Sequence, residues 1–262
     1  MNRIIHAQLI RLLRRKTIVL AAAGAAVFSV VAATTVFGAA KSGGAGLGGR
    51  PVTLQTLALH GGGTLAFATA ASFVGFFVFV TFIALRGAEI SGGTFRALLI
   101  RDPQRLRVLV GQVAGILVVA AGVIALAEVL TLVASVPMAA VRHVPTSGWF
   151  SVAALGDAVK NYATVLAGVA GWAVLGTTLA VVFQSAPLAL GVGFVWAGPI
   201  EHLVANAWSP ANHWFPGLVL QSLIAGGTTD LGLGRAAITG VVYCGLAAAA
   251  TLFLTARRDV TT

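Results

Sequence analysis

The chain has 262 residues, of which 58% are hydrophobic and only 9% are charged. Because a soluble domain carries about 25% charged residues, this composition excludes a water-soluble globule and predicts an all-α polytopic membrane protein. The formal net charge of +10 is expected where basic residues mark the cytoplasmic ends of membrane helices, so we expect no nucleic-acid partner.

The first 16 residues, MNRIIHAQLIRLLRRK, predict an amphipathic helix. Its apolar side chains share one face at a helical period: Ile5, Leu9, Leu12 and Leu13. Its arginines share the opposite face, and the segment has no acid: Arg3, Arg11, Arg14 and Arg15. Such a helix lies in the membrane interface, with its arginines near anionic lipid head groups. The alternative is an ordinary basic flank of the first span.

Six apolar stretches are long enough to cross ~30 Å of hydrocarbon, which takes about 20 helical residues. They are residues 17–39, 64–85, 108–133, 162–182, 187–205 and 235–256. We expect one transmembrane domain over residues 17–258 and a cytoplasmic tail at 259–262. Pro199 breaks the fifth stretch, and the Gly-rich segment 41–63 is expected to be flexible.

A charged segment, EISGGTFRALLIRDPQRLRVLVGQ, occupies residues 89–112 between the second and third spans. Thr94 can cap a short helix that ends near Leu99, and Asp102 followed by Pro103 is a strong helix start signal. The short helix has an apolar face, made by Phe95, Leu98 and Leu99. Since nothing else in the chain is expected to cover this face, the loop 86–107 predicts a cytoplasmic partner.

The distribution of lysine and arginine predicts the orientation of the chain. With both termini inside, the inner segments hold twelve of these residues and the outer segments hold five. We therefore expect both termini and the loop 86–107 to be cytoplasmic.

The outer segment 207–234 interleaves aromatic residues with prolines: Trp208, Pro210, Trp214, Phe215 and Pro216. Such aromatic side chains belong at the membrane interface. We expect a partly re-entrant hairpin here, since irregular backbone at membrane depth survives only where protein or water shields it.

Taken together, these features resemble the permease subunit of ABC exporters of the ABC-2 type. In that family the loop after the second span reads Glu, then Gly-Thr, then apolar residues, then Pro-x-x-Arg and a Gly-Lys pair. The matching positions are Glu89, Gly93, Thr94, Leu98, Leu99 and Pro103. The chain departs from the pattern at Gln112, where a lysine is common, and Arg105 and Arg107 bracket the usual arginine position.

The resemblance implies a type-2 ABC exporter fold, with an N-terminal elbow helix, a coupling helix in the loop 86–107 and an outer hairpin at 207–234 that covers the transport path. It implies that a separate ATP-binding subunit binds the loop through these residues: Glu89, Thr94, Phe95, Arg96, Leu98, Leu99 and Arg101. ATP and Mg would be held by that subunit, with no cofactor on this chain. A second permease chain, identical or different, would complete the pathway in the bacterial cytoplasmic membrane.

The chemistry of an enzyme is not apparent in the sequence. None of the three lysines stands in a phosphate-binding G-x-x-x-x-G-K-[ST] loop, and no metal-ligand or nucleophile motif is present. We expect no catalytic residue and no metal site. A polytopic scaffold or assembly protein without a motor is the alternative to a permease.

Four residues are candidates for the transport pathway: Glu128, Glu201, Trp214 and Phe215. An acid within a span is costly and commonly functional, but Glu128 has the equal alternative of a helix-packing hydrogen bond or an interfacial position. For Glu201 and His202, which follow Pro199, a solvated helix end is the expected environment. The small apolar and aromatic residues suit a hydrophobic or amphipathic substrate, such as a drug, a peptide or a lipid.

Overall fold

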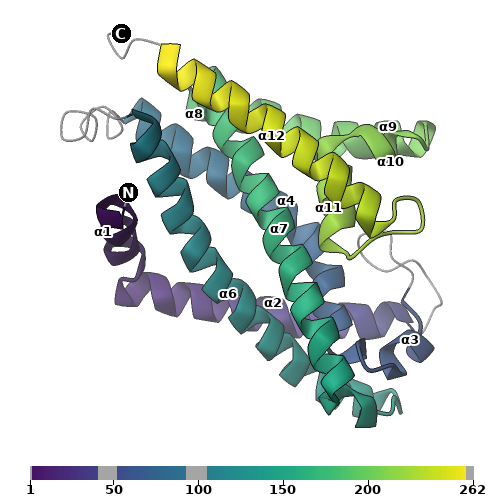
Figure 1. Ribbon diagram of the computed structural model, residues 1–262. Helices are drawn as coiled ribbons and strands as arrows, with labels where there is room; N and C mark the ends of the chain where they lie inside the picture. Colours follow the sequence, from purple (N-terminus) through teal and green to yellow (C-terminus); the bar gives the residue numbers. More distant parts are fainter. Residues whose placement is uncertain (1, 41–51, 93–104, 258–262) are drawn as a thin grey trace.

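A computed structural model describes residues 2–40, 52–92 and 105–257 of the chain (Figure 1). In these ranges there is no strand, and six helical units are long and apolar enough to cross a membrane. This confirms a multi-pass, all-helical membrane protein. The units are α2 (Arg15–Ala40), α4 (Gly62–Ser91), α6 (Arg105–Val141), α7 (Val152–Phe183), α8 (Ala186–Val195) continued by α9 (Glu201–Ala207), and α12 (Leu233–Arg257).

Shorter helices accompany these six units. They are α1 (Asn2–Leu12), α3 (Leu54–Ala58), a 3₁₀ turn (Ser147–Phe150), α10 (Ala211–Trp214) and α11 (Pro216–Ile224). A helix, α1, does precede the first span, and it packs against α6. In Figure 1 the C-terminal ends of α4 and α12 and the start of α6 gather at the upper left, whereas α3 lies at the lower right.

The centre of the bundle is the pair α4 and α7, and glycines on α7 let other helices approach it closely. A Cβ at Gly176 would meet α4 at Phe79 and Phe82, and a Cβ at Gly168 would meet Ile224 of α11. Small residues of this kind allow close packing in a medium where lipid tails are as apolar as leucine. The glycines of α7 therefore allow α4 and α11 to pack closely against the fourth span.

The outer surface of the bundle is apolar. Exposed valines and leucines line α2, α6 and α12: Val27, Val30, Val31, Val118, Val129, Val133, Val241 and Leu246. In water such a surface would be a large association patch. In a bilayer it is the surface that lipid tails cover, in agreement with spanning helices.

The third and fourth spans extend furthest beyond their predicted bounds. The helix α6 continues from the expected end near residue 133 to Val141, with Pro137 inside it, and stops where His143 takes a left-handed φ of 54°. There the amide of Val144 donates to the carbonyl of Ala139, a Schellman-type end. The helix α7 begins ten residues early because the Ser151 hydroxyl caps it by accepting the amide of Ala154.

The predicted interruption of the fifth span at Pro199 takes the form of a π-helical segment. This segment, Trp196–Ile200, joins α8 to α9 without ending the helix. Proline has no amide hydrogen, so the α-helical bonding pattern cannot continue through it unchanged. The side chains of α9 therefore point in other directions than a continuous α-helix from α8 would give them.

The expectation of a flexible Gly-rich segment is wrong for residues 52–63, while residues 41–51 lie outside the described residues. Thr53 caps α3 through a reciprocal hydrogen-bond pair with Thr56. A Cβ at Gly61, Gly62 or Gly63 would meet Asp157, the Leu57 carbonyl or Leu132, respectively. These glycines serve close packing, and at Gly62 a larger residue would meet backbone.

The segment 207–234 is partly helical, as predicted. Seven of the nine residues of α11 are buried, and the helix packs against α4, α7 and α12. A short helix between the last two spans is therefore folded back into the bundle.

Candidate functional site

Most of the predicted coupling residues lie outside the described residues: Thr94, Phe95, Arg96, Leu98, Leu99 and Arg101. Glu89 is described, and it is buried in the last turns of α4. It was expected to lie beside the partner-binding face, but its carboxylate pairs within the chain.

Arg86 is the centre of this buried cluster. Its Nη1 donates to Glu89 Oε2 at 2.6 Å and to Gln112 Oε1 at 2.7 Å, and the residue is 2% exposed. Its Nη2 also lies 3.4 Å from the Leu109 carbonyl oxygen. The cluster thus fastens the end of α4 to the start of α6, the two helices between which the predicted coupling segment runs.

The arginines predicted for the interface helix are described in part. Arg14 and Arg15 are exposed at the junction of α1 and α2. Arg3 and Arg11 belong to α1, but their side chains lie outside the described residues. On the same helix Gln8 is buried and Ile10 is exposed, so α1 has one face toward protein and another away from it.

Glu201 occupies a buried site at the start of α9, with 1% of its surface exposed. Its Oε1 accepts the amide of Gly217 at 3.3 Å, and its Oε2 accepts the amide of Leu218 at 3.1 Å. These amides belong to the first turn of α11, where backbone donors have no partner within the helix. The expectation of a solvated end is therefore wrong for Glu201, because α11 folds over it, although the neighbouring His202 is exposed.

Gly217 is part of the same arrangement. A Cβ there would meet the carboxylate of Glu201 and the ring of Trp172. The glycine thus lets a carboxylate from one helix reach the backbone of another. We call this contact between Glu201, Gly217 and Leu218 the Glu201 clasp.

Two of the predicted pathway residues lie next to the clasp. Phe215 makes an edge contact with Trp196 of the π segment, with ring centroids 5.8 Å apart. The carbonyl of Trp214 accepts a hydrogen bond from the hydroxyl of Tyr243 on α12, while its ring is 61% exposed. The structure therefore brings Glu201, Trp214 and Phe215 together.

Glu128 stands apart from this group on α6. It is 8% exposed, and its Oε1 is buried without a hydrogen-bond partner among the described residues. One turn further on, Thr131 donates to Ser29 of α2 at 3.1 Å, which shows that polar contacts do join these two spans. Glu128 is therefore a buried carboxylate on α6, and the structure brings it to none of the other predicted pathway residues.

A shallow apolar pocket of about 420 Å³ lies along the fifth span. It is lined by residues of α8 and the π segment: Pro187, Leu188, Gly191, Val192, Val195, Trp196 and Ile200. It is built from aliphatic and aromatic side chains, so it suits an apolar ligand or an apolar protein surface.

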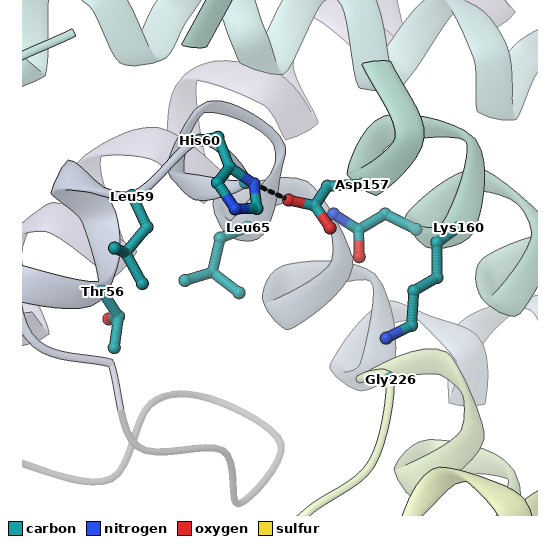
Figure 2. A pocket seen from close by; sticks show the side chains of 9 residues that line it. Thr56, Leu59, His60, Leu65, Asp157, Lys160 and Gly226 are labelled. Carbon is teal, nitrogen blue, oxygen red and sulfur yellow. Dashed lines mark hydrogen bonds and ion pairs between the residues drawn. The ribbon is translucent and has the colours of Figure 1, made fainter. Parts of the chain in front are cut away.

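A second group of polar residues lines a pocket of about 160 Å³ (Figure 2). These residues were not among the predicted site residues. His60 Nδ1 lies 2.5 Å from Asp157 Oδ2, and Lys160 follows one turn later on α7. Asn161 donates to the Thr64 hydroxyl at 2.9 Å. The spacing of Asp157 and Lys160 at the start of a helix was a usable signal, but the predicted fourth span began after both.

The polar contacts of these sites join helices to one another. Among the described residues, no three His, Cys, Asp or Glu side chains come together as metal ligands. The donors around Glu201 are backbone amides, which cap and orient rather than react.

Comparisons with models of protein families, with curated proteins and with solved structures found no match to this chain.

Proposed function

We propose that this chain is the permease subunit of an ATP-driven exporter of the ABC-2 type. It pairs with a second permease chain in the bacterial cytoplasmic membrane, with both termini cytoplasmic. Separate ATP-binding subunits hold ATP and Mg. The pair exports a hydrophobic or amphipathic substrate, such as a drug, a peptide or a lipid.

The observation that carries this proposal is the order of the elements. An amphipathic helix precedes six spans, and a short helix, α11, folds back into the bundle between the last two. This order, together with the match of the segment 89–112 to the ABC-2 pattern, is what an ABC-2 permease requires. A motorless scaffold has no need of an apolar helix face in a cytoplasmic loop.

The Arg86 cluster supports a mechanical role for that loop. Arg86 ties α4 to α6 through Glu89 and Gln112, so the two helices that flank the predicted coupling helix move as one unit. Closure of the ATP-binding subunits against Phe95, Leu98 and Leu99 then shifts both spans, which alternates access to the pathway.

The fifth span supports the proposed pathway and pairing. Its exposed face carries the apolar pocket of about 420 Å³, which suits a second permease chain or an apolar substrate. The same span also holds α11 through the Glu201 clasp. Movement of α9 is thereby coupled to the outer hairpin that covers the exit.

The test is to purify the tagged chain from its native host and to identify an ATPase that accompanies it. Phe95→Asp and Leu98→Asp place a charge on the apolar face and are expected to abolish co-purification and transport, with insertion unchanged. Gln104→Asp places the same charge in the same loop away from that face and is the matched control. The proposal fails if no ATPase accompanies the wild-type chain, or if the Asp variants keep the partner and the transport.

A further inference from the structure

Two pockets adjoin at His60, at the turn between α3 and α4. The polar pocket of about 160 Å³ includes His60, Asp157 and Lys160. The other, of about 250 Å³, is mostly apolar and is lined by His60 together with Leu132, Trp149, Leu155 and Ala158. His60 lines both, so one ligand can occupy the two at once.

The polar pocket has a cation, Lys160, at its edge. The carboxylate of Asp157 is engaged by the ring of His60 at 2.5 Å. Lys160 is exposed, and within the part of the chain that the structure describes it has no ion-pair partner. In Figure 2 its side chain lies across the pocket from Thr56 and Leu59. An anionic group can pair with the Lys160 ammonium.

The walls of the apolar pocket are held in place. Trp149 is buried, and its Nε1 donates to the Leu57 carbonyl at 2.9 Å. Phe150 and Leu155 are 73% and 65% exposed, so the pocket opens to the surroundings along their side chains. A hydrocarbon chain that enters there would cover the exposed side chains of Phe150 and Leu155 and make apolar contact with them.

Both pockets lie at one end of the bundle. A buried cluster joins the ends of α2 and α6 to this region through Phe37, Ala139 and Trp149. Spanning helices end at the level of the lipid head groups. A polar pocket beside an apolar one at this level matches the two parts of a membrane lipid.

We propose that these two pockets bind one phospholipid with a singly charged anionic head group. The phosphate contacts Lys160 at the edge of the His60–Asp157 pair, and the first part of an acyl chain lies along Leu132, Leu155 and Ala158. The site stands independently of the permease assignment, because it uses residues far from the predicted coupling loop.

The experiment measures lipid binding to the purified full chain by native mass spectrometry. We expect dioleoyl phosphatidylglycerol to bind more tightly than dioleoyl phosphatidylcholine. Lys160→Gln is expected to weaken phosphatidylglycerol binding about tenfold, the effect of losing one charged hydrogen bond. The matched control is Arg235→Gln, an exposed cation at the start of α12 that lines neither pocket, and it is expected to bind as the wild type does.

A second arm separates a lipid from a free anion. Ala158→Phe fills the apolar pocket and is expected to weaken phosphatidylglycerol roughly tenfold, as the exclusion of about two methylene groups would. Should Ala158→Phe fail to give a monodisperse protein, Leu155→Ser removes an exposed apolar wall instead. Glycerol phosphate, the head group without chains, is expected to bind far more weakly to the wild type.

Three results would each overturn the proposal. They are equal binding of the two lipids by the wild-type chain, unchanged phosphatidylglycerol binding in Lys160→Gln, and glycerol phosphate binding as tight as that of the lipid. The last result would identify a site for a soluble anion.

Discussion

At the level of single side chains, the apolar bundle holds two carboxylates in different surroundings. Glu201 accepts two backbone amides from the first turn of α11, whereas the buried Oε1 of Glu128 has no partner among the described residues. A buried polar group is tolerated when hydrogen bonds replace those it made with water. Glu201 meets this condition, because its two oxygens accept amides at the positive end of the α11 dipole.

Replacement of Glu201 by leucine is expected to lower the free energy of unfolding by about 1–3 kcal/mol, because two buried amides lose their acceptor. Glu201→Gln keeps one acceptor oxygen, so its free energy of unfolding should lie between those of the wild type and Glu201→Leu. The measurement is thermal unfolding of the purified protein in detergent. Asn206→Leu, an exposed change on the same helix, is the control; equal effects of the two leucine variants would contradict the clasp.

Arg86 is the second residue on which the fold depends. Arg86→Leu is expected to cost about 3–5 kcal/mol, since it breaks a buried ion pair and leaves Gln112 without its donor. Low yield or a lower unfolding temperature would be the observable result. Arg142→Leu, a half-buried arginine at the other end of α6, should have a much smaller effect, and a wild-type-like Arg86→Leu protein would show that the cluster is dispensable.

At the level of elements, α1 combines two surroundings. It packs against α6 with Gln8 buried, and it presents Ile10 and the junction arginines Arg14 and Arg15 outward. A helix of this kind can be fixed to the bundle and still lie against lipid.

The triple variant Arg11→Glu, Arg14→Glu and Arg15→Glu is expected to misplace the first span or to lower its insertion, because positive charges near a span hold it at the anionic inner surface. Protease protection in membranes measures the topology. The matching triple change to lysine keeps the charge and should insert normally. Normal topology and yield of the Glu variant would mean that α1 is held by its contact with α6 alone.

At the level of the whole molecule, six spans require both termini to lie on the same side of the membrane. The excess of lysine and arginine in the segments 1–16, 86–107 and 257–262 predicts that this side is the cytoplasm.

Single-cysteine labelling on a Cys244→Ala background tests this orientation. Asn212→Cys in α10 should react with a membrane-impermeant reagent in intact cells, whereas Arg96→Cys should react only after the membrane is opened. Positions such as Val241, on the lipid-facing side of α12, serve as unreactive controls. Labelling of residue 96 from outside would reverse the predicted topology.

The sequence by itself determined the class of the protein and the number of spans, because hydrocarbon thickness requires about 20 apolar residues in each. The ends of α2 and α12 lie within two residues of the prediction. The C-terminal end of α6 and the start of α7 were not predicted from the sequence. They are set by a Schellman turn at His143 and a cap at Ser151, and these local signals are harder to recognise in a sequence than a hydrophobic stretch.

Only the tertiary structure decided what the polar residues do. Glu201 and Gly217 are 16 residues apart in the chain, and His60 and Asp157 are 97 apart. The sequence around a carboxylate near the end of a span is the same whether its side chain faces water, lipid or a backbone amide. Its environment is set by which helix folds over it, and that choice depends on long-range packing of glycines and bulky side chains, which no local pattern encodes.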